Sequence, residues 1–177
     1  MIKSVEATIK GKLPGILMHK YPMEPIEAFE KKTKEEQAEL AAYRDPDTKM
    51  LYVPGEAVQR ALISAAVFSK GKGRATLQKT AAACLIISPA RLSLGVKDYV
   101  IDSRSVVIPA TKGRVIRHRP MLEEWEITFA LQYDDSLLTV KQVQQVVNDA
   151  GTRVGLLDFR PEHKGAFGRF VVISWKD

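Results

Sequence analysis

Three histidines are the side chains best suited to exchange protons near neutral pH, because imidazole titrates in that range. His19 lies close to Tyr21 in the N-terminal part of the chain. His118 lies in a strongly basic stretch, and His163 lies in a glycine-rich one. General acid–base catalysis needs two groups within hydrogen-bond reach of the reacting atoms, and the spacing brings no pair of these histidines together. They are therefore weak catalytic candidates; in the simpler interpretation His118 binds phosphate and the other two form local hydrogen bonds.

Metal and cofactor sites are not indicated. Cys84 is the only cysteine and the histidines are scattered, so no pair has the spacing of zinc ligands. We therefore expect neither a metal nor a cofactor.

The same composition bears on cellular location. A lone cysteine excludes an internal disulfide, and residues 1–10 lack the apolar region of a signal peptide. The longest uncharged stretch rich in apolar residues, Thr80–Ala90, is well short of the roughly 20 residues that a membrane helix needs. We expect a protein of the cytoplasm of a bacterial, archaeal or phage-infected cell, with no membrane association.

Positive charge is concentrated in the middle of the chain. Residues 57–122 contain twelve Lys and Arg against two acidic residues, whereas the whole chain carries a net charge of +6, so both flanks together are slightly acidic. A local excess of this size predicts one cationic surface, and a polyphosphate backbone is its commonest partner.

Two basic segments stand out within this block. Lys112 and Gly113 separate two β-prone runs, as the turn of a hairpin would, and the sequence around Gly71 and Gly73 breaks a helix with three cations. Either segment is a solvated charged loop or a phosphate-binding one, and we favour the second interpretation. The candidate ligands of these two segments are Lys70, Lys72, Arg74, Arg104, Lys112, Arg114, Arg117, His118 and Arg119.

A third candidate segment is the glycine-rich connection, residues 155–170, which precedes the last predicted strand. Its cations Arg160, Lys164 and Arg169 are suited to phosphates, and glycines permit close approach of a ligand to the backbone. Phe159 and Phe167 could stack on bases, but we favour the alternative that both fill the core.

Hydrophobic periodicity predicts the elements that position these segments. The uninterrupted alternation before Tyr133 is typical of a strand with one buried face. Thr33 with Glu36, and Thr139 with Gln142, have the spacing of helix-capping boxes. The predicted core elements are strands at residues 2–11, 98–109, 122–133 and 169–175, and helices at residues 54–69 and 139–150.

These elements predict one α+β domain spanning residues 1–177, with insertions at about 13–50 and 70–122. The order strand, helix, strand, strand, helix, strand is that of the ferredoxin-like βαββαβ unit. Its antiparallel sheet has one free face, the face on which RNA-recognition-motif domains bind single-stranded bases. We further expect a helical insertion that lies on the core and a basic β-hairpin that projects from it.

The glycine-rich connection resembles the G-rich loop of the RAMP superfamily, the repeat-associated proteins of CRISPR effector complexes. The large insertion ending in a basic hairpin is similar to the thumb of that superfamily's backbone subunits. Residues 14–19 and 155–170 also resemble segments of uncharacterised phage and prophage proteins. The resemblance implies a subunit that polymerises along single-stranded RNA or DNA and grips its backbone with the hairpin and the basic loops.

Three classes of function remain open at this point. The leading one is a non-catalytic, single-stranded nucleic-acid-binding protein that forms homo-oligomers or filaments. The second is a metal-independent endoribonuclease that uses a histidine, as RAMP relatives do. The third is a phage structural or assembly protein whose basic face meets an acidic protein partner.

Overall fold

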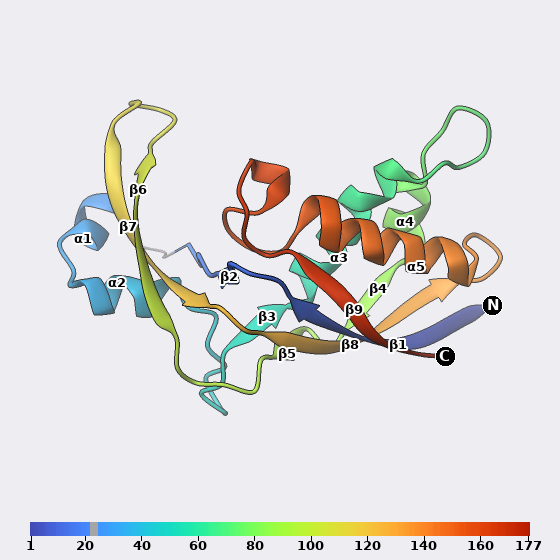
Figure 1. The fold of residues 1–177 in the computed structure, drawn as a ribbon, viewed down its shortest axis with the longest axis horizontal. Coiled ribbons are helices and arrows are strands. Elements are labelled where there is room, and N and C mark those ends of the chain that lie inside the picture. Colours follow the sequence, from blue (N-terminus) through green and yellow to red (C-terminus); the bar gives the residue numbers. More distant parts are fainter. Residues whose placement is uncertain (22–24) are drawn as a thin grey trace.

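The computed structural model describes residues 1–21 and 25–177, which form a mixed α+β fold with antiparallel sheets (Figure 1). The strands are β1 (Ile2–Gly11), β2 (Ile16–Leu17), β3 (Tyr52–Pro54), β4 (Ile86–Ser88), β5 (Arg91–Ser93), β6 (Val100–Val107), β7 (Arg114–Leu122), β8 (Glu126–Asp134) and β9 (Phe170–Lys176). The α-helices are α1 (Ile26–Glu30), α2 (Lys34–Ala41), α3 (Gly55–Ala65), α4 (Gln78–Cys84) and α5 (Val140–Asp149). No described helix has the length and apolar character that crossing a bilayer requires.

The larger sheet has four strands in the order β4-β8-β1-β9, and every neighbouring pair is antiparallel. The alternation predicted for β8 is confirmed, because Phe129 and Leu131 are buried whereas Thr128 is exposed. Helices α3 and α5 lie on the same side of this sheet and pack against each other (Figure 1). The main hydrophobic core lies between these two helices and the sheet.

Both core helices begin where the sequence predicts. Helix α3 follows Pro54 and buries Val58 and Leu62 on one stripe. Helix α5 begins after Thr139, whose side chain accepts a hydrogen bond from the backbone N–H of Gln142 while the Gln142 side chain accepts one from the Thr139 N–H. This reciprocal capping satisfies two donors that a helix start otherwise leaves free.

The chain does not leave the helical conformation at Gly151, directly after the predicted end of α5 at residue 150. The chain continues through a π turn (η2, Ala150–Val154), and the residue with positive φ is Gly155, at 78°. A Cβ at position 151 would collide with the carbonyl oxygen of Phe170, so Gly151 instead allows β9 to pack closely on the helix end.

The expectation that residues 98–109 form a strand of the main sheet is wrong. Strand β6 pairs with β7 in a second sheet, of order β2-β7-β6, and the place beside β8 is taken by the three-residue strand β4. Every residue of β6 is exposed or half-buried, so it has no apolar face to bury against the helices, whereas Ile87 of β4 is buried. Strand β5 pairs with β3 in a small third sheet.

Residues 13–50 are more than a surface insertion, which corrects a second expectation. Ile16 and Met18 are fully buried in the main core, and Phe29 is buried as well. Helix α2 begins at the predicted Thr33 capping box and packs against β7. This segment therefore supports the root of the β6–β7 hairpin.

Candidate functional site

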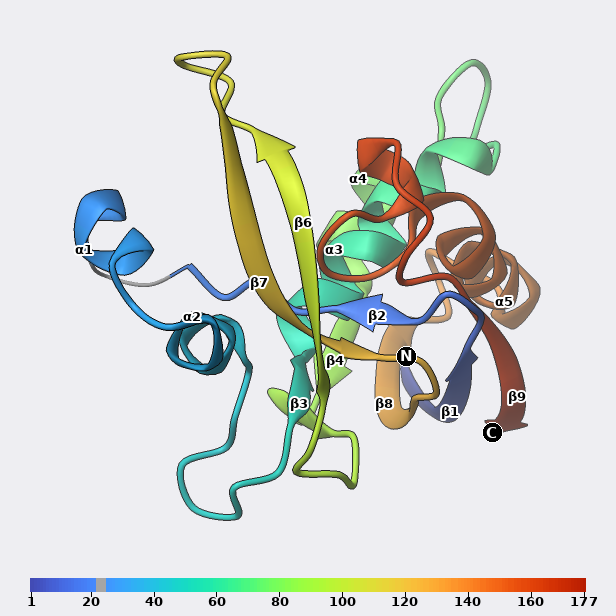
Figure 2. The same ribbon diagram turned by 60° about the vertical axis from the view of Figure 1, so that its left-hand side comes forward.

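Three basic segments that are distant in sequence rise on the same side of the molecule. They are the tip of the β6–β7 hairpin, the glycine-rich connection with its short 3₁₀ helix (η3, Pro161–His163), and the loop at residues 70–76. In both ribbon views the connection stands between the hairpin tip and the loop (Figures 1 and 2). We call this side of the molecule the basic side.

Some cations of the hairpin are exposed to solvent, whereas others pack on aromatic rings or form ion pairs. Lys112 and Arg114 at the tip are exposed. Arg117 is half-buried, with its guanidinium 5.7 Å from the centroid of the Phe29 ring. Arg104 forms an ion pair with Asp102 at 2.9 Å and lies over the Phe167 ring. The tip is thus the part of the hairpin best placed to contact a phosphate.

Arg119 does not belong to the exposed basic surface, contrary to the sequence expectation. Its side chain is 6% exposed and forms an ion pair with Asp158 of the glycine-rich connection. Asp102 is a second, more distant partner at 3.8 Å. A phosphate could reach this guanidinium only by displacing carboxylates that already neutralise it, so we assign Arg119 a structural role.

The loop at residues 70–76 is a short excursion closed by a β-bridge between Lys70 and Thr76. Lys70, Lys72 and Arg74 are all exposed, as the sequence interpretation requires. Gly73 has a positive φ of 64°, which favours glycine at the turn. The loop therefore offers three cations to an anionic ligand without burying any of them.

The glycines of the connection are required for the packing of its own backbone. A Cβ at Gly165 would collide with the Phe159 carbonyl, and one at Gly168 would collide with the Leu156 carbonyl. Gly155 and Gly168 also have positive φ, at 78° and 80°. Phe167 is buried, as expected, but the expectation that Phe159 also fills the core is wrong, since its side chain is 39% exposed.

The cations of the connection differ in availability. Arg160 donates to the Leu157 carbonyl at 2.8 Å and forms an ion pair with Glu162 at 2.9 Å. Lys164 and Arg169 are exposed, and Arg169 precedes the buried Phe170, which is consistent with the free face of the sheet. Lys164 and Arg169 are therefore the better phosphate ligands of the three candidates.

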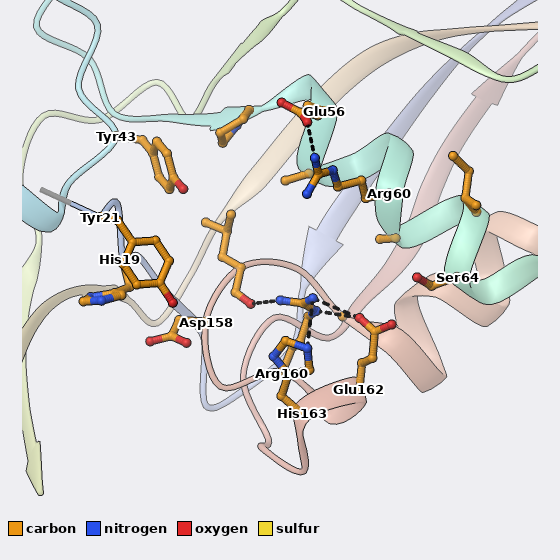
Figure 3. A pocket seen from close by; sticks show the side chains of 16 residues that line it. His19, Tyr21, Tyr43, Glu56, Arg60, Ser64, Asp158, Arg160, Glu162 and His163 are labelled. Atoms are coloured by element: carbon orange, nitrogen blue, oxygen red, sulfur yellow. Dashed lines mark hydrogen bonds and ion pairs between the residues drawn. The ribbon is translucent and has the colours of Figure 1, made fainter. Parts of the chain in front are cut away.

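A cavity of about 750 Å³ opens between α3, the glycine-rich connection and the segment after β2 (Figure 3). Glu56 and Arg60 line it from α3, whereas Arg160, Glu162 and His163 line it from the connection. The segment after β2 supplies His19 and Tyr21. Tertiary structure thus brings together two of the three histidines, which the sequence spacing left apart.

The histidines of the cavity have different surroundings. Burial lowers the pKa of His19, so its imidazole is neutral at neutral pH, and its Nδ1 finds no hydrogen-bond partner among the described residues. His163 Nε2 lies 3.4 Å from a guanidinium nitrogen of Arg160. His118 is not part of the cavity; its Nδ1 is hydrogen-bonded to the Ser103 hydroxyl across the hairpin at 2.7 Å.

Sequence reasoning missed several residues of this cavity. Tyr43, Glu56 and Arg60 line it together with Ala57 and Ser64. Glu56 and Arg60 are four residues apart in a helix and are ion-paired at 2.7 Å, which is also the commonest pattern of a solvated helix surface. No local signal distinguished them, because the opposite wall of the cavity is formed by residues about a hundred positions later.

The free face of the larger sheet is not built for base stacking. None of its exposed or half-exposed positions on β1 and β8 is aromatic. Most are polar or charged, as at Glu6, Thr8, Thr128 and Gln132, and Ile2 and Ala130 are apolar exceptions. Thr8 and Thr128 are hydrogen-bonded to each other through their hydroxyls at 2.8 Å. Aromatic stacking platforms of the RNA-recognition-motif kind are therefore absent from these two strands, all of whose residues the structure describes.

Comparison with known proteins gives no family, because no family model and no curated protein matches the chain. Among residues 1–21 and 25–177, no group of three or more His, Cys, Asp and Glu side chains is arranged to hold a metal ion. The candidate site is therefore described by its own geometry: three basic segments lie on one side of the molecule, and one of them, the glycine-rich connection, also lines a cavity with aromatic and ion-paired side chains.

Proposed function

We propose that this protein binds single-stranded nucleic acid on its basic side. The observation that carries the proposal is the common orientation of the hairpin tip, the glycine-rich connection and the loop at residues 70–76 (Figures 1 and 2). Clustered, exposed Lys and Arg bind phosphates through charge and counterion release, without reading sequence. The free, buried thiol of Cys84 supports an intracellular place for this activity.

The chain order and strand order support a ferredoxin-like core as part of this proposal. Strands β1, β4, β8 and β9, with α3 and α5 between them, follow the order of the βαββαβ unit. On this interpretation the β6–β7 hairpin is an insertion comparable to a RAMP thumb, and successive copies bind along one strand as homo-oligomers.

Binding should weaken with salt, and the hairpin tip should supply part of that dependence. On a single strand each phosphate contact contributes a slope of about 0.7 log units of affinity per log unit of salt. Replacing Lys112, Arg114 and Arg117 together by alanine should flatten the slope by about 1.4 to 2 units, where the upper figure includes a contact from the half-buried Arg117. Fluorescence anisotropy of a labelled 30-nucleotide RNA or DNA, titrated at several salt concentrations, measures the slope.

A matched triple variant controls for the loss of net charge. Lys3, Lys10 and Lys176 are exposed residues of β1 and β9, on the four-stranded sheet. Their replacement by alanine removes the same charge and should leave most of the slope intact. Equal slopes for both variants would refute the assignment of the hairpin, and an affinity insensitive to salt would refute phosphate contacts as the basis of binding.

Metal-independent RNA cleavage is a second candidate, favoured by the presence of His19 and His163 in one cavity. A neutral His19 is in the protonation state that a general base requires, and burial holds it there. In this candidate function His19 would take the proton of the 2′-hydroxyl, whose oxygen attacks the adjacent phosphorus, and His163 would donate a proton to the 5′-oxygen that leaves.

Cleavage is tested with labelled RNA in EDTA. If the candidate function is right, the RNA is cut, and His19→Ala and His163→Ala each lower the rate by about a hundredfold or more. The His118→Ala variant is the matched control. It should cleave the RNA at the wild-type rate, because His118 lies in the hairpin and does not line the cavity. Intact RNA with all four proteins leaves binding as the sole activity of the site.

A further inference from the structure

We infer that the 750 Å³ cavity receives an unpaired, uncharged nucleobase of the bound strand. The inference rests on the proposed function and names what that site takes. Its size lies within the range of pockets that enclose small organic ligands. Tyr21, Tyr43 and His19 offer ring surfaces, and Ala57 and Leu157 offer apolar ones (Figure 3).

The charges around the cavity argue for a neutral ligand. Glu56 is paired with Arg60 at 2.7 Å, and Glu162 is paired with Arg160 at 2.9 Å. Asp158 is paired with Arg119 from β7. A phosphate placed here would face three carboxylates and would have to compete for guanidinium groups that are already neutralised, whereas an uncharged ring would disturb none of these pairs.

Hydrogen-bonding groups for the edge of a base are present as well. The Nδ1 atom of His19 is buried and has no hydrogen-bond partner among the described residues, so a base could reach it only if the His19 ring turned toward the cavity. Burial raises the pKa of Tyr43, so its hydroxyl keeps its proton and can donate. These groups share one cavity with the exposed ring of Tyr21.

The position of the cavity fits a base whose backbone remains outside. Lys20 lies between His19 and Tyr21 in the sequence, and Lys164 follows His163, so two of the three walls continue into an exposed cation. The strand can therefore leave its phosphates on exposed lysines while one base turns into the neutral interior. Phosphate contacts and base contacts are then separable by mutation.

The test compares two labelled 12-nucleotide strands, one of deoxyadenosines and one made entirely of abasic sites, at a single salt concentration. Wild-type protein should bind the adenosine strand at least tenfold more tightly. Tyr21→Ala should weaken binding of the adenosine strand about five- to tenfold and leave the abasic strand unaffected, because it removes a stacking ring. Tyr21 is 80% exposed, so its loss should not unfold the protein.

Two further variants make the result specific. Ala57→Leu adds bulk to the cavity wall without changing charge. It should also weaken binding of the adenosine strand until its affinity approaches that of the abasic strand. The Lys112, Arg114 and Arg117 triple variant should weaken both strands equally. Equal affinities of the wild type for both strands, or a preference that survives both cavity variants, would overturn the base pocket alone; binding to neither strand would overturn the proposed function with it.

Discussion

Replacing Phe129 by alanine should lower the free energy of unfolding by about 3 to 5 kcal/mol, the usual cost of deleting a large aromatic side chain from a core. Phe129 is 1% exposed, lies in the central strand β8 and pairs in register with the buried Ala7 of β1. Helices α3 and α5 cover this face, so the surrounding core cannot collapse fully into the space left. Urea unfolding followed by circular dichroism measures the loss.

Thr128→Ala is the matched control on the opposite face of the same strand. Thr128 is exposed and loses one hydroxyl hydrogen bond, to Thr8. Its cost should stay below about 1 kcal/mol, since exposed hydrogen bonds contribute little net stability. Similar losses for both variants would mean that the register of β8 is wrong.

Arg119→Ala should cost about 3 kcal/mol, because it leaves the carboxylate of Asp158 without its buried partner. Asp158 is tied to the chain on another side, where its backbone N–H donates to the Leu17 carbonyl at 3.1 Å. The Asp158 side chain is 31% exposed, so solvent compensates part of the unpaired charge, and the loss of the packed arginine stem supplies the rest of the cost. Arg114→Ala, which removes an exposed arginine of the same strand, should change stability by less than about 0.5 kcal/mol.

A double-mutant cycle separates the ion pair from the packing of the long arginine side chain. Asp158→Asn removes the charge that Arg119 neutralises, and Arg119→Met keeps the apolar stem. The double variant should be more stable than the sum of the two single losses predicts, by about 1 to 3 kcal/mol. Strict additivity would show that the two side chains do not stabilise each other.

The strongest sequence predictions concerned elements that local physics determines. The alternation of β8 and the capping boxes at Thr33 and Thr139 each involve residues close in sequence, so the structure could be anticipated there. The assignment of residues 98–109 to the main sheet failed for the opposite reason. The strand that pairs with β8 must bury apolar side chains under the helices, and which segment can do so depends on residues far away in the sequence. The three residues of β4 meet this requirement, whereas none of the eight residues of β6 is buried.

In the candidate site, too, features set by local sequence were predicted and features set by distant residues were not. Charge density predicted exposed cations on the hairpin and the loop, and Lys112, Arg114 and Lys72 are exposed. It could not separate Arg114 from Arg119, because the carboxylate that holds Arg119 comes from a segment 39 residues later. The meeting of His19 and His163 in one cavity is also a product of tertiary structure alone.

The close-packed glycines at positions 155, 165 and 168 have a consequence for the entropy of binding. Because side chains at these positions would collide with neighbouring atoms, the backbone of the connection has few alternative conformations that keep its packing. Ordering a flexible segment costs about 1 to 2 kcal/mol per residue. A ligand that contacts Lys164 or Arg169 therefore has to order mainly their side chains, since folding has already fixed the backbone that carries them.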